Sequence, residues 1–202
     1  MKFELNYPLD VVNISQKFGE NSVSFYKELG MKGHNGIDFS CESGTILRAA
    51  HDGHVVYTGL DDSNGEILVL STNEMYDYNG KQVYFKTIYA HLTSNSYKVV
   101  PGQNVLAGDI IALSDNTGKY TTGPHLHFGL KPIEQGQENY IWTNLEQGNG
   151  YLGAIDPEPF WTGKKAFDIK LMRAMIPLLT QVIDLLKQLY ATIKQNQGSI
   201  SK

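Results

Sequence analysis

The sequence predicts an all-β protein: an antiparallel β-sandwich or barrel-like core followed by a C-terminal helix. Three observations carry this prediction. From residue 1 to about 163, short apolar runs alternate with Gly, Asn, Asp and Pro, which is typical of strands joined by turns. Asn79 and Gly80 stand between two aromatic runs and tolerate positive φ, which strongly indicates a hairpin. From Ile169 onward, apolar residues recur at steps of three and four, which indicates a helix.

The strands are expected in short segments enriched in β-branched and aromatic residues. These segments are residues 45–49, 54–59, 67–71, 82–89, 110–113 and 126–130. The stretch 133–150 is rich in Gln, Asn, Glu and Gly, so we expect an excursion at the surface. The organisation that follows is a β-domain of residues 1–163 and an amphipathic helical segment of residues 164–202.

The helical segment carries a heptad pattern of apolar residues. The seam consists of Ile169, Met172, Ile176, Leu179, Ile183, Leu186, Tyr190 and Ile193. Further apolar residues, among them Leu178, Val182 and Leu185, widen the stripe beyond a two-stranded seam. Pro177 either kinks the helix or marks its start. The stripe either packs on the chain's own β-domain, or residues 166–195 mediate self-association or docking to a partner protein. The polar face is not markedly basic, which disfavours a membrane surface.

Composition excludes several classes of protein. The 202 residues are 41% hydrophobic and 19% charged, which is typical of an ordered globular chain. A formal charge of -4 argues against a nucleic-acid partner, because sequence-independent binding needs a basic face. Cys41 is the only cysteine, so an internal disulfide is excluded. No apolar run is long enough for a secretory leader or a membrane-spanning helix, so either a leader was removed or export follows another route.

The first motif that indicates chemistry is GHNGID at residues 33–38. Its two glycines and Asn35 disfavour a helix, so a tight loop leading into a strand is expected. Such a loop can turn the imidazole of His34 and the carboxylate of Asp38 towards one point. Both groups are good zinc ligands.

The second motif is TGPHLHFG at residues 122–129. Alternate side chains of a strand share a face, so His125 and His127 point together while Leu126 and Phe128 point to the core. Burying two imidazoles without partners is costly, which favours a metal or a reacting group beside them. A third motif, YAHL at residues 89–92, places His91 at the end of a long apolar strand, at a strand edge or rim.

Together the motifs predict a catalytic metal site. Two histidines and a carboxylate make a three-ligand site with one open position, which is the arrangement of catalytic zinc rather than structural zinc. Two further histidines remain for proton transfer and for stabilising charge on a tetrahedral intermediate. His51 and His54 are expected to be structural or to face solvent, and Cys41 to be a buried, inert thiol.

These motifs resemble those of the lysostaphin/LytM-type zinc metallopeptidases of the bacterial cell wall, over roughly residues 8–160. HNGID is similar to the family's His-x-x-x-Asp, TGPHLHFG to its His-x-His strand, and YAHL to its separate catalytic histidine. Similar family features are RAAHDGHVVYTG at 48–59, VVPGQNVLAGDIIALSDNTG at 99–118 and GAIDPEPF at 153–160. Asp115 departs from the family, which usually has glycine there, and Cys41 stands where a small uncharged residue is common.

The resemblance implies a LytM-type peptidase domain at residues 1–163 that holds one zinc ion through His34, Asp38 and His127. His91 and His125 would flank a metal-activated water, and the enzyme would be a zinc metalloendopeptidase that hydrolyses a peptidoglycan cross-bridge or stem-peptide cross-link. It would act extracytoplasmically at the cell wall. The loops 72–82 and 133–150 would select the bond.

Two alternatives stay open. One is a catalytically silent relative that binds and activates another wall hydrolase. The other is a phage tail-associated lysin component attached through its helical tail. Tyr76, Tyr78, Tyr120 and Trp142 either line a peptide groove or belong to ordinary aromatic packing.

Overall fold

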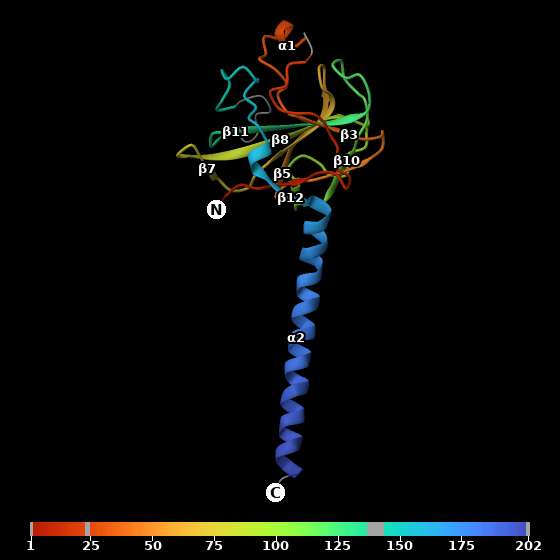
Figure 1. Cartoon of the computed structure of the whole chain (residues 1–202), viewed down its shortest axis with the longest axis vertical. Coiled ribbons are helices and arrows are strands. Elements are labelled where there is room, and N and C mark those ends of the chain that lie inside the picture. The colour runs from red at the N-terminus through yellow and green to blue at the C-terminus, as the bar shows by residue number, and fades with distance from the viewer. Residues whose placement is uncertain (1, 23–24, 137–143, 201–202) are drawn as a thin grey trace.

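A computed structural model describes residues 2–22, 25–136 and 144–200, with side chains up to residue 194. Figure 1 shows a β-domain from which one long helix projects. The strands are β1 (Leu5–Tyr7), β2 (Ile14–Gln16), β3 (Ile37–Ser40), β4 (Ile46–Arg48), β5 (Gly53–Asp61), β6 (Gly65–Ser71), β7 (Tyr76–Tyr78), β8 (Lys81–Leu92), β9 (Asn104–Val105), β10 (Ile110–Leu113), β11 (His125–Ile133) and β12 (Trp161–Lys165). The helices are α1 (Phe25–Glu28), the 3₁₀ turn η1 (Glu158–Phe160) and α2 (Ala166–Ile200).

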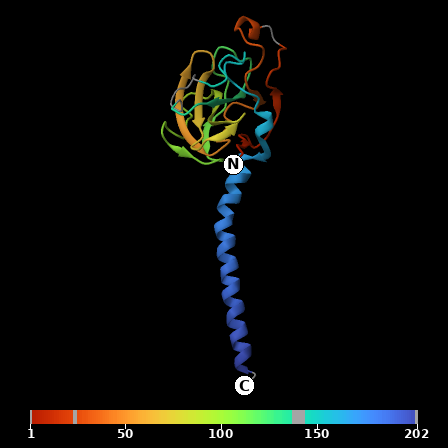
Figure 2. The same cartoon turned by 90° about the vertical axis from the view of Figure 1, so that its left-hand side faces the viewer.

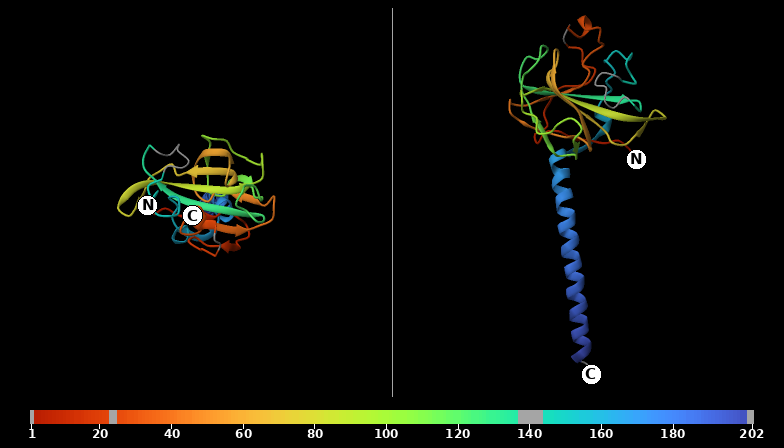
Figure 3. Two further views of the ribbon diagram at one scale, coloured as in Figure 1. Left: turned by 90° about the horizontal axis from the view of Figure 1, so that it is seen from above. Right: turned by 180° about the vertical axis from the view of Figure 1, so that it is seen from behind.

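The main sheet has eight strands in the order β2-β3-β11-β8-β6-β5-β9, with β7 paired to β8, and each of its pairs is antiparallel. Strands β4 and β10 form a second antiparallel pair, and β1 and β12 a parallel one. Figure 3 shows from above how the long strands twist across one another. The predicted antiparallel β-fold with a C-terminal helix is therefore confirmed, with β1 and β12 as the exception.

The expected strands are present with shifted ends, and β10 begins and ends where predicted. The predicted hairpin joins β7 to β8, with Tyr78 opposite Lys81 and positive φ at Asn79 and Gly80. Strands β1, β2, β9 and β12 were not predicted, because runs of two to five residues carry too little periodic signal. Their pairing is decided by distant parts of the chain.

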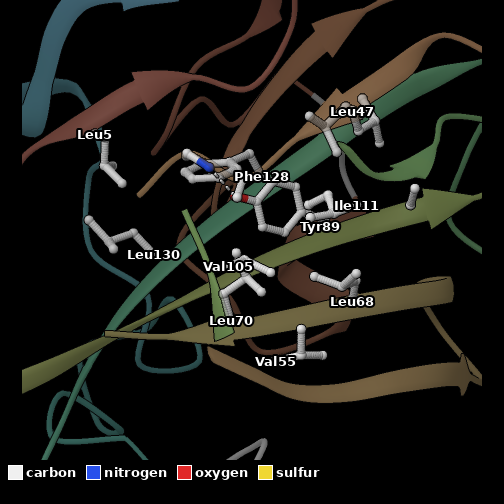
Figure 4. Close-up of a cluster of buried hydrophobic side chains, with 14 of the residues drawn as sticks. Leu5, Leu47, Val55, Leu68, Leu70, Tyr89, Val105, Ile111, Phe128 and Leu130 are labelled. Carbon is white, nitrogen blue, oxygen red and sulfur yellow. Dashed lines mark hydrogen bonds between the residues drawn. The ribbon is translucent and has the colours of Figure 1, made fainter. Parts of the chain in front are cut away.

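The main core lies on one face of the sheet, where large side chains such as Phe39, Leu68, Tyr89 and Phe128 are fully buried. Figure 4 shows several of these side chains converging between the strands. A smaller apolar cluster of Ile67, Val69, Ile88 and Ala90 lies on the opposite face of β6 and β8. Both faces of these strands are thus covered, which explains their continuous apolar runs.

Helix α2 starts directly after β12, at Ala166, and continues through Pro177. The alternative that the helix starts at Pro177 is therefore wrong. We propose that the domain boundary lies at this junction, close to the expected division after residue 163. Among the described residues, no helix combines the length and hydropathy that a membrane span needs.

The alternative that α2 packs along its own β-domain is also wrong. Contacts with the domain are confined to the first two turns, where Arg173 forms two hydrogen bonds with the Asp52 carboxylate at 2.7 and 2.9 Å. Lys170 contacts Asp109 at 2.9 Å. Figure 2 shows the rest of the helix extending away from the domain. The sequence pattern of the β-domain does not show whether the domain packs against this helix, so only the structure reveals that it does not.

His51 is a structural histidine, as expected, buried in the bend just before β5. Its Nδ1 lies 2.8 Å from the carbonyl oxygen of Asp52, and its Nε2 lies 2.9 Å from Oγ1 of Thr87. Burial lowers the pKa of His51 from 6.5 to about 4. The folded domain therefore holds this imidazole neutral under mildly acidic conditions in which the unfolded chain protonates it.

This difference predicts a pH-dependent loss of stability. The contribution of His51 is complete above about pH 6.5 and is lost as the pH falls towards 4, by up to about 3 kcal/mol. We expect His51→Gln to remove that part of the slope of unfolding free energy against pH, measured by urea unfolding between pH 7 and 4. His54→Gln, at a less buried histidine three residues away, is the control and should keep the wild-type slope. Equal slopes in all three proteins would contradict this account.

Candidate metal centre and cleft

Three of the predicted residues meet at one point. His34 lies in a loop that leads into β3, as the GHNGID motif predicts, and Asp38 lies on β3 directly opposite His127 of β11. The Oδ1 atom of Asp38 lies 3.1 Å from Nε2 of His34 and 2.9 Å from Nδ1 of His127. The two imidazole nitrogens lie 3.0 Å from each other.

The donor atoms of this trio fit a divalent cation. His34 Nδ1 lies 3.2 Å from the carbonyl oxygen of Lys17, which can only accept, so its Nε2 presents a lone pair. That lone pair faces Oδ1 of Asp38 and Nδ1 of His127. No placement of protons on these three atoms turns all three contacts into hydrogen bonds, whereas a cation between them would accept a lone pair from each. Among the His, Cys, Asp and Glu side chains of the described residues, these three form the one group close enough to share a metal ion. Two imidazoles and a carboxylate are ligands typical of catalytic zinc.

The charge states also suit a cation. Burial alone would raise the pKa of Asp38, but the adjoining side chains of His127 and His34 hold it well below its usual range. Burial lowers the pKa of His127. The site therefore presents an ionised carboxylate and a neutral imidazole, the forms that bind metal.

Gly36 allows the loop to approach β11. A Cβ atom at this position would lie 2.6 Å from both the His127 Cε1 atom and the Phe128 carbonyl oxygen, which is closer than real contacts allow. Only glycine therefore lets the loop hold His34 and Asp38 against His127.

The histidine pair on β11 is arranged as predicted. Leu126, Phe128 and Leu130 are fully buried in the main core, whereas His125 and His127 point to the other face of the sheet. The carbonyl oxygen of Gly123 lies 2.8 Å from Nδ1 of His125, and His125 Nε2 lies 3.7 Å from Oδ2 of Asp38. His125 therefore directs its second nitrogen towards the trio.

His91 reaches the same place by a distortion of the backbone. The pairing of β6 with β8 shifts register between Glu66 and Leu68, opposite this residue, and the φ of His91 is 61°. Bulges of this kind turn a side chain out of the regular alternation and are frequent beside active sites. His91 lies at the end of its long apolar strand, as expected, and there it is buried on a central strand of the sheet.

The two imidazoles of His91 and His125 lie side by side, with ring centroids 4.6 Å apart. His91 donates from Nδ1 to the carbonyl oxygen of Thr117, at 2.7 Å, which leaves its Nε2 as the proton acceptor. Burial, together with the neighbouring His127, lowers the pKa of His91 to about 4. Both rings are thus anchored through one nitrogen, and the second is available for proton transfer.

All five residues line one cleft with a volume of about 540 Å³. One wall is aromatic and apolar: Phe25 stacks on Tyr120 with ring centroids 5.8 Å apart, and Tyr26 and Leu29 of the same segment also line it. The volume falls in the range of small-molecule and peptide-sized sites. The cleft is large enough for a short extended peptide beside the trio.

The cleft includes some predicted groove residues and not others. Tyr120 lines it, whereas Tyr76 and Tyr78 pack against Phe85 of the core, and Trp142 lies outside the described residues. Asn144 of the 133–150 loop contributes, but none of residues 72–82 does. The prediction missed the wall formed by α1. An aromatic pair at residues 25–26, ahead of the GHNGID motif, was the available signal.

Cys41 is not part of the trio. It is half-buried at the border of the main core, and burial raises the pKa of its thiol. A thiol with a raised pKa is a poor metal ligand and a poor nucleophile, which agrees with the expected inert role.

Residues 32–139 match the sequence model of peptidase family M23. The glycyl-glycine endopeptidase ALE-1 of Staphylococcus capitis is 39% identical over 134 residues, covering 65% of this chain and 30% of the relative. The peptidoglycan DD-endopeptidase ShyA of Vibrio cholerae is 38% identical over 97 residues, covering 48% and 20%. The chain thus spans less than a third of the length of these curated relatives.

Solved structures show the same fold. LytU aligns with a TM-score of 0.52 and 32% identity over 75% of this chain and 86% of that structure. The catalytic domain of lysostaphin from Staphylococcus simulans aligns with a TM-score of 0.53 and 28% identity over 74% and 91%. These alignments cover most of each of the two solved structures.

Proposed function

The chain belongs to peptidase family M23, and from this premise we propose that it is a zinc-dependent endopeptidase that hydrolyses peptide bonds in bacterial peptidoglycan. The observation that carries the proposal is the convergence of the trio His34, Asp38 and His127 with two anchored imidazoles in one cleft. The names of the relatives support the substrate class, since both a glycyl-glycine endopeptidase and a peptidoglycan DD-endopeptidase resemble this chain.

In the proposed site, His34 Nε2, Asp38 Oδ1 and His127 Nδ1 would hold the ion. Bound zinc would supply Lewis-acid chemistry, polarising a carbonyl group and lowering the pKa of water towards 7. Asp38 brings one negative charge, so the ion would keep a net positive charge facing the cleft. The carbonyl group of Lys17 orients His34, as partners of metal-binding histidines commonly do.

His91 and His125 would transfer a proton and stabilise the developing negative charge. Because His91 is neutral and presents its Nε2 as an acceptor, it can take a proton from an attacking water molecule. His125 directs its own Nε2 towards the trio, and in its protonated form this nitrogen would donate to the oxyanion that develops on the scissile carbonyl. The wall of Phe25 and Tyr120 would exclude water and orient the peptide.

The proposed enzyme acts extracytoplasmically, at the wall that contains its substrate. Either a peptide cross-bridge or a stem-peptide cross-link would enter the cleft in extended form. Asn144, which lines the cleft, would help to distinguish them.

The test is digestion of purified walls of two kinds, one with glycine cross-bridges and one cross-linked directly between stem peptides. We expect the full chain with zinc to release new amino termini from at least one of them, identified by mass spectrometry of the fragments. A protein that is folded and zinc-loaded but releases no termini from either wall would overturn the proposal. Stimulation of a second wall hydrolase would then favour the silent binding module.

A further inference from the structure

Helix α2 exposes an apolar surface that its own domain leaves uncovered. Its contacts with the β-domain come from its first two turns, where the Arg48 guanidinium lies 4.7 Å above the ring of Phe167 and where Lys170 and Arg173 pair with aspartates. Fourteen large apolar side chains on α2 are 42–69% exposed. They are Phe167, Leu171, Met172, Met175, Ile176, Leu178, Leu179, Val182, Ile183, Leu185, Leu186, Leu189, Tyr190 and Ile193.

All of these side chains except Phe167 belong to two adjacent heptad seams. The first seam is the predicted one, from Ile169 to Ile193. The second seam consists of Leu171, Met175, Leu178, Val182, Leu185 and Leu189, again at alternating steps of four and three. At 100° per residue the two seams lie side by side, and polar residues such as Thr180, Gln181, Asp184, Lys187 and Gln188 occupy the remaining face.

We propose that α2 assembles with the α2 helices of other copies of this chain into a bundle of at least three helices. A single heptad seam is buried by one neighbouring helix, so two adjacent seams call for two neighbours. In a closed ring of identical chains, the first seam of each helix meets the second seam of the next. A two-stranded coiled coil would leave the second seam in water.

The size of the exposed surface also fits association between copies. At roughly 60 Å² per half-exposed side chain, α2 offers on the order of 800 Å² of apolar surface, about what each partner contributes to a stable interface. A monomeric protein seldom leaves a patch of this size exposed. Six charged residues in the described part of α2 include both signs, so like charges do not oppose the association of copies.

The junction with the β-domain would present the catalytic clefts away from the bundle. Besides the ion pairs of Lys170 and Arg173, the turn at Gly108 packs so closely that a Cβ there would lie 2.4 Å from the Ala166 carbonyl oxygen. Helix α1, which forms one wall of the cleft, lies at the opposite end of the domain from α2 (Figure 1). A bundle of α2 helices would therefore leave the clefts open, and several clefts of one assembly could face the same wall surface.

The experiment measures the molar mass of the full chain in solution by sedimentation equilibrium. We expect at least three chains per particle. The double variants I183E/L186E and V182E/L185E each place two charges on one seam, and each should reduce the particle to a single chain. The control Q181E/Q188E places the same charges on the polar face and should keep the assembly. Near-UV circular dichroism of the β-domain shows that each variant is folded.

Two results would overturn the proposal. A wild-type chain that is monomeric at every concentration would exclude self-assembly, whether or not it sediments with phospholipid vesicles. A wild-type dimer that survives V182E/L185E would show that only the first seam is used. Neither result bears on zinc binding or wall cleavage, so this proposal and the proposed function can fail separately.

Discussion

We expect His127→Ala to lose zinc and peptide cleavage together. His127 supplies Nδ1 at the centre of the trio, 2.9 Å from Asp38 and 3.0 Å from His34, so its removal leaves two ligands. Changes to outer partners of metal ligands already cost roughly 10–100-fold in affinity or activity, and loss of a ligand should cost about 10³-fold or more. Zinc content should fall from about one ion per chain to near zero, measured by atomic absorption after dialysis.

Metal removal gives an independent readout of the same site. A bound ion stabilises the folded chain by mass action, so a chelator should lower the Tm of the wild type and leave that of His127→Ala unchanged. His54→Ala is the matched control, because His54 lies outside the trio and bonds to Asn73. It should keep zinc, cleavage and the response to chelator. A His127→Ala protein with a full complement of zinc would place the metal elsewhere.

The second large effect concerns His91 and His125, the two imidazoles outside the trio. We expect His91→Gln and His125→Gln to keep zinc and to lower kcat by about 10²–10⁴-fold, the range for loss of general acid–base or oxyanion-stabilising groups. The effect should fall on kcat rather than KM, because neither ring is needed to bind the peptide in its ground state. Steady-state kinetics on a soluble peptide of the cleaved sequence would measure both constants.

The arrangement of these two rings adds a further requirement. Since their centroids lie 4.6 Å apart, they should act as a unit, and the double variant should be little worse than either single one. Thr121→Val is a suitable control, because Thr121 lies beside His125 without being its main anchor: its Oγ1 is 3.4 Å from Nδ1, against 2.8 Å for the Gly123 carbonyl. Unchanged kcat in both glutamine variants would remove the proposed proton-transfer role.

Much of the site could be predicted from the sequence, because neighbouring residues decide the local backbone geometry. The alternation in β11 required His125 and His127 to share a face, and the glycines of the GHNGID motif required a loop before β3. The Asn79-Gly80 hairpin likewise follows from two neighbouring residues that tolerate positive φ. In each case the residues that decide the geometry are adjacent in the chain.

Other features depended on distant partners. The bulge that turns His91 into the cleft is set by its pairing with β6, and nothing within YAHL indicates it. The aromatic wall needs Phe25 beside Tyr120, residues almost a hundred positions apart. The parallel pair of β1 and β12 joins the two ends of the domain.

Periodicity and backbone preference act between neighbours, so the turn-rich antiparallel β-domain and the heptad helix follow from the amino-acid sequence, and the motifs supplied the candidate residues of a metal site. Three features emerge from the folded chain: Asp38 stands opposite His127, 89 residues away, His91 joins them from a distorted central strand, and α2 projects uncovered. Strand register and helix docking are fixed by which surfaces bury one another across the whole domain, and that balance is not encoded in any single stretch of chain.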